Sequence, residues 1–169
     1  EDCQVAFETL KRCLTSAPVL AFPSPDRKFV LYTDASASAI GAILTQIDED
    51  GVERVIQYAS QQMNKQQMAW SATEREAFAI VRAVTRFREY LLGRRFTLYT
   101  DHQPLATLCV STMKNSRILR WSAILSEFDM DIKHKPGGQQ KADFLSRVPP
   151  SVAQSPPEPA TADGEDPEN

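Results

Sequence analysis

Two short runs of apolar and β-branched residues in this chain end in the same tetrapeptide, Leu-Tyr-Thr-Asp. The first run covers residues 29–34 and the second covers residues 96–101. Both runs are too short for independent helices and are rich in β-branched and aromatic residues, which is typical of buried strands. Each predicted strand therefore delivers a carboxylate at its C-terminal end, Asp34 in the first and Asp101 in the second.

A meander of three strands is predicted around the first tetrapeptide. Small residues follow Asp34 and lead into the apolar run 39–46, which we expect to pair antiparallel with the first strand. The acidic residues 48–50 and the glycine after them are a strong turn signal, and a third strand is predicted at residues 55–60. The three acidic side chains could be metal ligands, but a solvated loop tip explains them without any function. The polar residues 61–70 are predicted to be a loop.

A long helix is predicted after this loop, because apolar residues recur at helical spacing from residue 77 onward. Ser71 and Glu74 fit a capping box at its start, and Gly93 is the expected stop. This leaves Glu76 at the edge of the buried stripe, where a carboxylate is costly unless it is paired, hydrogen-bonded or bound to a metal. The helix separates the third strand from the second tetrapeptide, so we expect a crossover that makes the two tetrapeptide strands parallel.

Shorter elements are predicted before and after the strands and the long helix described above. Residues 5–14 have the spacing of an amphipathic helix, and three prolines between residues 18 and 25 then favour an extended connector. A helix is predicted at residues 116–128, with Leu119 among its apolar positions and with Arg117 and Arg120 on its exposed face. We also expect a helix at residues 102–108, a strand at residues 130–134 and one or two helical turns at residues 142–147.

Composition indicates one domain with a polar tail. With 169 residues and 42% hydrophobic content, the chain is long enough for one ordinary core. The net charge is −3, but five acidic residues and no Lys or Arg lie after residue 148, so residues 1–148 carry 19 − 17 = +2. Three cysteines without a Cys-x-x-Cys pair argue against a disulfide framework and a structural zinc site. There is no apolar run long enough to cross a bilayer, so we expect a soluble intracellular protein without a membrane partner.

Four carboxylates stand at predicted element ends or on buried faces, and each has an ordinary explanation. Asp101 could cap the following helix, and Glu76 could close a capping box with Thr73. Asp143 could oppose the dipole of a helix N-terminus. Asp34 is the hardest to explain structurally, because it ends a central strand and is followed by small residues. The predicted topology brings all four to one edge of the sheet, where hard oxygen ligands suit Mg²⁺ or Mn²⁺. Two such ions about 4 Å apart promote phosphodiester hydrolysis.

Four stretches around these carboxylates are Thr-Asp-Ala-Ser at residues 33–36, Glu-Arg-Glu-Ala-Phe-Ala-Ile-Val at 74–81, Tyr-Thr-Asp-His-Gln-Pro-Leu at 99–105 and Ala-Asp-Phe-Leu-Ser-Arg at 142–147. Together, in this order, they resemble the ribonuclease H domain of Ty3/gypsy-type retrotransposon reverse transcriptases. The resemblance runs from about residue 7 to residue 147. It implies an α/β ribonuclease H-like fold with a five-stranded mixed sheet in the order 3-2-1-4-5 and helices packed on it. It also implies a connection segment from the polymerase at residues 1–25 and the ribonuclease H domain at 26–148. The proline-rich acidic composition of residues 149–169 predicts a disordered tail.

The resemblance also implies a function. The metal-binding and catalytic set of the family falls on Asp34, Glu76, Asp101 and Asp143, and its cofactors are two Mg²⁺ ions, or Mn²⁺ in their place. The implied reaction is cleavage of the RNA strand of RNA/DNA hybrids, leaving a 3′-hydroxyl and a 5′-phosphate. The implied partners are the hybrid and the polymerase and connection domains of the same polyprotein, in a cytoplasmic virus-like particle from which the nucleus can be reached. The alternative is an inactive or weakly active module that binds hybrid or scaffolds the polymerase.

One segment departs from the family pattern. Relatives usually read Tyr-x-Pro-Gly-x-x-Asn-x-x-Ala-Asp before the last aspartate, whereas residues 134–143 here are one residue shorter and lack the Asn. His134 takes the place of the Tyr, near where cellular ribonucleases H carry a histidine thought to aid product release. The alternative is a strand-end histidine whose hydrogen bonds are satisfied.

Substrate contacts are predicted less directly. Ser36 and Gln103 lie next to the metal carboxylates and are candidates for contacts with a 2′-hydroxyl or the backbone. Between residues 86 and 147 there are eleven Lys or Arg residues and six acidic residues. Arg117 and Arg120 belong to this basic region, which favours contact with phosphates, although a solvated surface is the ordinary explanation.

Overall fold

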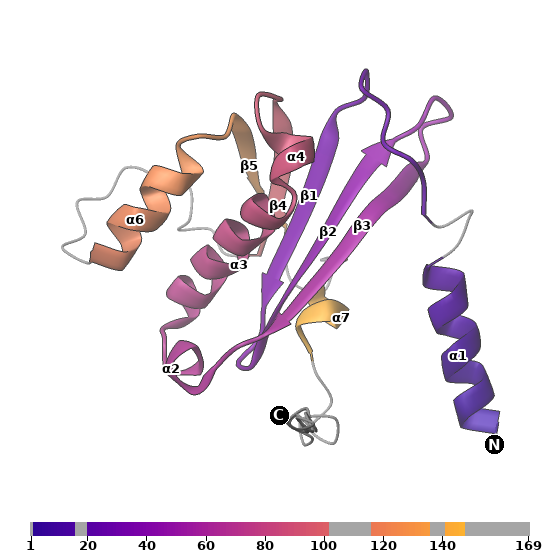
Figure 1. Ribbon diagram of the computed structural model, residues 1–169, viewed down its shortest axis with the longest axis horizontal. Helices are drawn as coiled ribbons and strands as arrows, with labels where there is room; N and C mark the ends of the chain where they lie inside the picture. The colour runs from indigo at the N-terminus through magenta and orange to yellow at the C-terminus, as the bar shows by residue number, and fades with distance from the viewer. Residues whose placement is uncertain (1, 16–19, 102–115, 136–140, 148–169) are drawn as a thin grey trace, which may run out of the picture.

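A five-stranded mixed sheet forms the centre of the protein (Figure 1). The computed structural model describes residues 2–15, 20–101, 116–135 and 141–147. The strand order is β3-β2-β1-β4-β5, which confirms the predicted order. The elements are α1 (Asp2–Leu14), β1 (Phe29–Ala35), β2 (Ala39–Ile47), β3 (Glu53–Gln62), α2 (Lys65–Met68), α3 (Ala72–Arg86), α4 (Arg88–Leu91), β4 (Phe96–Thr100), α6 (Ser116–Leu125), β5 (Met130–His134) and α7 (Asp143–Ser146).

The two tetrapeptides lie side by side on neighbouring strands. β1 pairs antiparallel with β2 and parallel with β4, and Leu31 is opposite Leu98 in the parallel pair. The register therefore matches the two tetrapeptides residue for residue, and their tyrosine rings, Tyr32 and Tyr99, stack with centroids 5.2 Å apart. Continuing this register to the strand ends places Asp34 opposite Asp101, as the crossover prediction requires.

Alternate residues of β1 face two different layers. Phe29 and Leu31 belong to the larger core cluster, which includes buried residues of α3 and α6. Val30 and Tyr32 point to the other face of the sheet and pack with Ala142 and Leu145 beside α7. Helices α3 and α6 therefore cover one face, while the short α7 lies on the other (Figure 1). Asp34 lies at the end of β1 between these layers.

Helix α3 begins where the capping box predicted it. The Ser71 hydroxyl accepts the N–H of Glu74, and the Glu74 carboxylate accepts the N–H of Ser71, which leaves Glu76 on the buried face. The predicted single helix is interrupted at Phe87 and continues as α4. Phe87, at the break, and Leu91, in α4, are both fully buried, so the apolar stripe of α3 continues into α4. Gly93 follows α4 at φ +72°, the conformation expected of a glycine stop.

Two local predictions were wrong. Residues 65–68 form helix α2 within the predicted loop, because Asn64 and Gln67 make a reciprocal capping box. Leu119 is 59% exposed, since α6 buries residues 118, 121 and 125 along a different stripe. The N-terminal amphipathic helix is confirmed as α1, but no residue of it is buried.

Some predicted segments lie outside the described residues, namely the helix at 102–108, most of the loop before Asp143 and the tail at 149–169. None of the helices that the structure describes is long and apolar enough to cross a membrane.

Candidate metal centre

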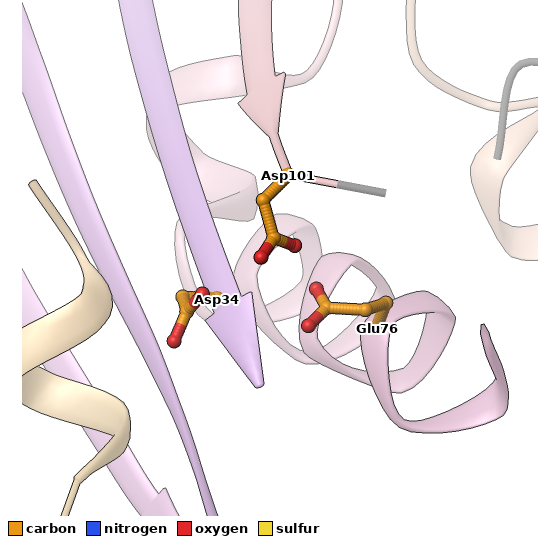
Figure 2. A group of neighbouring side chains, drawn as sticks. All are labelled: Asp34, Glu76 and Asp101. Atoms are coloured by element: carbon orange, nitrogen blue, oxygen red, sulfur yellow. The ribbon is translucent and has the colours of Figure 1, made fainter. Parts of the chain in front are cut away.

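Three carboxylates from distant parts of the sequence meet at one end of the sheet. Asp34 comes from the end of β1, Asp101 directly follows β4, and Glu76 comes from the first half of α3. One oxygen from each of the three lies within 4.8 Å of the others (Figure 2). Figure 2 shows the Asp101 carboxylate directed into the space between Asp34 and Glu76. The structure thus confirms that these predicted ligands are neighbours.

Glu76 is held in place through one oxygen only. Its Oε1 accepts the N–H of Ala35 at 3.0 Å, which ties α3 to the end of β1. Its Oε2 is buried and has no hydrogen-bond partner among the described residues. A buried acceptor without a partner costs about 1–3 kcal/mol, and more when it is charged. This oxygen therefore needs a proton or a cation.

The electrostatics of the cluster also favour a cation. Glu76 is only 5% exposed, and its burial, followed by the charges of Asp101 and Asp34, raises its pKa to about 8. Burial likewise raises the pKa of Asp34, and the charges of Asp101 and Asp143 raise it further. The hydrogen bond from Ser146 acts in the opposite direction, but the net shift of the pKa is upward. Hard oxygen ligands in this arrangement fit Mg²⁺ or Mn²⁺, whose charge would offset the repulsion between the carboxylates.

We expect the metal-free protein to lose stability as the pH rises from about 4.5 to about 8, because Glu76 must ionise in a buried site. In that range the unfolded chain has released the proton and the folded chain retains it, so the free energy of unfolding falls with pH. For this one proton the slope approaches about 1.4 kcal/mol per pH unit. Asp34 adds to the slope in the same direction. Urea unfolding in EDTA at several pH values measures it.

Glu76→Gln is the matched variant for this measurement, because the amide keeps the shape of the side chain and does not titrate. Its stability should depend less on pH than that of the wild type, by up to the slope of one proton. Equal slopes in the two proteins would show that Glu76 is already ionised in the folded metal-free state. Addition of Mg²⁺ at pH 8 should stabilise the wild type more than the variant.

The fourth predicted ligand, Asp143, is close to the cluster but is not part of it. Asp143 is the first residue of α7, and its carboxylate accepts two hydrogen bonds from Arg147, at 2.9 and 2.6 Å. Its charge is nevertheless near enough to raise the pKa of Asp34. The structure therefore brings three of the four carboxylates together and holds the fourth in an ion pair on the adjacent helix.

Two serines link α7 to the end of β1. The Ser146 hydroxyl donates to Asp34 Oδ2, a contact that the sequence patterns did not reveal. Ser36, predicted as a substrate contact, donates instead to the carbonyl of Ser146, and its oxygen accepts the N–H groups of Ser38 and Ala39. The sequence gives one local indication that Ser146 lies near the site: it follows the predicted ligand Asp143 by three residues on the same short helix.

The other predicted contact residues have different environments. His134 Nε2 lies 2.9 Å from the carbonyl oxygen of Asp101, which satisfies the strand-end histidine and also places it beside the cluster. Arg117 pairs with Glu74 at 3.0 Å and lies over the Trp70 ring at 4.2 Å, whereas Arg120 is exposed. Gln103 lies outside the described residues.

The acidic turn after β2 has a structural explanation. Asp48 Oδ1 accepts the N–H groups of Asp50 and Val52, and Oδ2 accepts from Arg54 at 2.8 Å. Glu49, at the same turn, pairs with Arg27. The interpretation of these acidic residues as a solvated loop tip therefore explains them without a role as metal ligands.

The comparison with known proteins agrees with this fold. Residues 24–128 match the RNase H-like domain found in reverse transcriptase. The Pol polyprotein of transposon opus from Drosophila melanogaster is 40% identical over 156 residues, which are 91% of this chain and 16% of that protein. The transposon Tf2-3 polyprotein from Schizosaccharomyces pombe is 36% identical over 148 residues, 85% of this chain and 11% of the polyprotein. The chain thus spans a small part of these relatives.

Solved structures show the same fold at low sequence identity. A foamy viral protease-reverse transcriptase in complex with double-stranded DNA has a TM-score of 0.62 and 14% identity, over 80% of this chain and 26% of that one. LC11-RNase H1 in complex with an RNA/DNA hybrid has a TM-score of 0.52 and 19% identity, over 70% of this chain and 93% of that one. The matched domain and the transposon relatives, together with this fold, establish that the chain belongs to the RNase H-like domains of retrotransposon reverse transcriptases.

Proposed function

We propose that this domain is an endoribonuclease that hydrolyses the RNA strand of RNA/DNA hybrids within a retroelement reverse transcriptase. The observation that supports it most is the cluster of Asp34, Glu76 and Asp101, in which Asp34 and Glu76 are buried and one Glu76 oxygen has no partner among the described residues. A cluster that served only packing would be costly, because three carboxylates in one place raise each other's free energy. A phosphotransferase with an aspartyl nucleophile is less suitable, because Asp34-Ala35-Ser36 lacks its Asp-x-Asp pattern.

The carboxylates have distinct roles in this proposal. Asp34, Glu76 and Asp101 would hold the metal ions, and Asp143 would join them once its carboxylate leaves Arg147. Two bound Mg²⁺ ions, or Mn²⁺, would activate a water and stabilise the leaving 3′ oxygen. The N–H of Ala35 holds Glu76 toward Asp34, so the ligand from α3 is oriented before an ion binds.

Substrate binding is proposed for the basic surface near this site. Arg120 is exposed on α6 and is available to phosphates, while Arg117 is braced by Glu74 and Trp70 and would position this surface. Ser36 and Gln103 stay candidates for contacts near the scissile phosphate, and His134, next to Asp101, for aiding product release. A foamy viral protease-reverse transcriptase and LC11-RNase H1 were both solved with RNA/DNA hybrid, which supports the same substrate class here.

The wider setting follows from the transposon relatives. We propose that residues 1–25 connect a polymerase to the ribonuclease H domain at 26–148, and that residues 149–169 form a linker. The exposed apolar side chains of α1, Val5, Phe7 and Leu10, would then be covered by the polymerase or connection domains. The expected location is a cytoplasmic virus-like particle from which the nucleus can be reached.

A second candidate is a domain that binds hybrid without cutting it. The ion pair between Asp143 and Arg147 favours this alternative, because it withholds the fourth carboxylate from the cluster. The two candidates share the fold and the nucleic-acid surface, and they differ in whether a phosphodiester bond is broken.

Incubation with a hybrid labelled in its RNA strand tests the proposal. We expect the chain, alone or with its polymerase domain added, to cut the RNA in Mg²⁺ or Mn²⁺ and to leave 5′-phosphate and 3′-hydroxyl ends. The same RNA in an RNA duplex, and the hybrid in EDTA, are the controls and should stay intact. Binding of the hybrid without cleavage in either metal would favour the second candidate instead.

A further inference from the structure

The hydroxyl of Ser146 is the contact that joins helix α7 to the metal centre. Ser146 has no exposed surface, and its Oγ donates to Oδ2 of Asp34. The same Oγ lies 2.9 Å from the carbonyl oxygen of Asp143. Within the described part of the chain, Ser146 is the one hydrogen-bond donor to the Asp34 carboxylate.

The single hydroxyl hydrogen of Ser146 has two possible acceptors, the Asp34 carboxylate and the Asp143 carbonyl. A serine hydroxyl carries a single proton, and neither the carbonyl of Asp143 nor an ionised Asp34 can donate in return. A hydrogen bond to an ionised carboxylate is about twice as strong as one between neutral groups, so donation to Asp34 is preferred. The proton of Ser146 is therefore directed at the carboxylate from within α7, the helix that carries Asp143.

Other hydrogen bonds and close contacts hold α7 against the sheet. Ser36 donates to the carbonyl of Ser146, and Ser60 on β3 donates to the carbonyl of Leu145 at 2.7 Å. The backbone of α7 also passes directly over Gly41 of β2, where an added Cβ would come within 2.8 Å of both the Ala142 oxygen and the Ser146 nitrogen. A helix of four residues is not stable by itself, so these contacts determine where it lies.

We propose that Ser146 is a positioning residue, whose hydroxyl orients the Asp34 carboxylate for metal binding and sets the place of α7, and hence of Asp143, relative to the metal centre. The inference rests on the metal site of the proposed function but not on cleavage. Residues that hydrogen-bond to metal ligands commonly change metal affinity or activity by about 10- to 100-fold when they are replaced. Loss of the Ser146 hydroxyl leaves the Asp34 carboxylate without this hydrogen bond and removes the direct link between Asp34 and α7, the helix that carries Asp143.

The test measures binding of Mn²⁺ to the whole chain without nucleic acid, by isothermal titration calorimetry at fixed pH. Ser146→Ala should weaken Mn²⁺ binding about tenfold. Ser146→Cys keeps nearly the same volume but is a poor donor, so it should behave like the alanine variant rather than the wild type. The matched control is Ser126→Ala, whose hydroxyl donates to the carbonyl of Ala123 on the exposed end of α6 and which should bind Mn²⁺ normally.

Ser36→Ala separates the two parts of the proposal, because Ser36 contacts α7 but not Asp34. It should speed hydrogen exchange at the Leu145 amide, which donates to the Ala142 carbonyl, and should weaken Mn²⁺ binding less than Ser146→Ala does. Wild-type Mn²⁺ affinity in both Ser146 variants, with unchanged melting temperatures, would overturn the proposal. If the wild type binds Mn²⁺ in a Ser146-dependent manner but cuts no hybrid, the proposed function fails and this inference stands.

Discussion

Replacing Asp34 by asparagine is expected to reduce cleavage of the RNA strand by about a thousandfold or more, because it replaces a charged ligand of the cluster by a neutral amide. Loss of about 4 kcal/mol of transition-state stabilisation corresponds to this factor. The same change should leave the melting temperature in EDTA unchanged or higher. Asp34 is buried beside two other carboxylates, so a neutral amide relieves their repulsion. Activity and stability should thus change in opposite directions.

The measurement is initial cleavage of a labelled hybrid at saturating Mg²⁺, together with thermal unfolding in EDTA. Asp131→Asn is the matched control, since Asp131 is an exposed residue of β5 that pairs with Lys133 at 3.5 Å. Asp48 is less suitable, because its carboxylate organises the turn after β2. Cleavage by Asp34→Asn at a rate close to the wild type would show that the metal centre lies elsewhere.

Replacing Gly41 by alanine is expected to displace α7 and to lower both stability and activity. An ideal Cβ at this position would lie 2.7 Å from Leu145 Cβ and 2.8 Å from two backbone atoms of α7. Backbone atoms cannot rotate away as a flexible side chain can, so the helix itself must move. We expect a loss of about 1–3 kcal/mol in the free energy of unfolding. Cleavage should fall at least tenfold at saturating metal, because Ser146 and Asp143 move with α7.

Gly51→Ala provides a control with the same chemical change. Gly51 has nothing within 4 Å of an added Cβ, but its φ of +76° makes alanine strained there. The strain should cost about 1–2 kcal/mol, similar to the effect at Gly41, without any change in cleavage below the melting temperature. If Gly41→Ala and Gly51→Ala cleave the hybrid equally well, the close packing of α7 on Gly41 of β2 is not needed for the reaction.

The sheet and three of its carboxylates could be predicted from the sequence because their signals are local and mutually consistent. The two tetrapeptides predicted strands, and the long helix between the meander and the second tetrapeptide predicted that the two strands are parallel. The Ser71 capping box fixed the phase of α3 and so placed Glu76 on the buried face. No metal motif was needed for this part of the argument.

The details that the sequence did not reveal depend on contacts between distant residues. Ser146 and Asp34 are 112 positions apart, and nothing near either residue indicates that they meet. The break at Phe87 likewise has no signal in the sequence pattern, since the apolar spacing continues through it into α4. Helix α2 is too short to have a period, although its Asn64 and Gln67 capping pair was readable. The ion pair of Asp143 with Arg147 has the i,i+4 spacing of a helical charge pair, so it is consistent with the helical turns predicted at residues 142–147.

The parallel register of β1 and β4 limits how the length of this chain can vary. Each strand residue advances by about 3.3 Å and alternates between the two faces of the sheet. One residue inserted between Leu31 and Asp34, or between Leu98 and Asp101, would therefore shift one carboxylate along the sheet and turn it to the wrong face. The turn after β2, where residues 49–51 are exposed, is not restricted by this register. Insertions and deletions among related transposon domains should accordingly collect in that turn, while the spacing from leucine to aspartate stays equal in both strands.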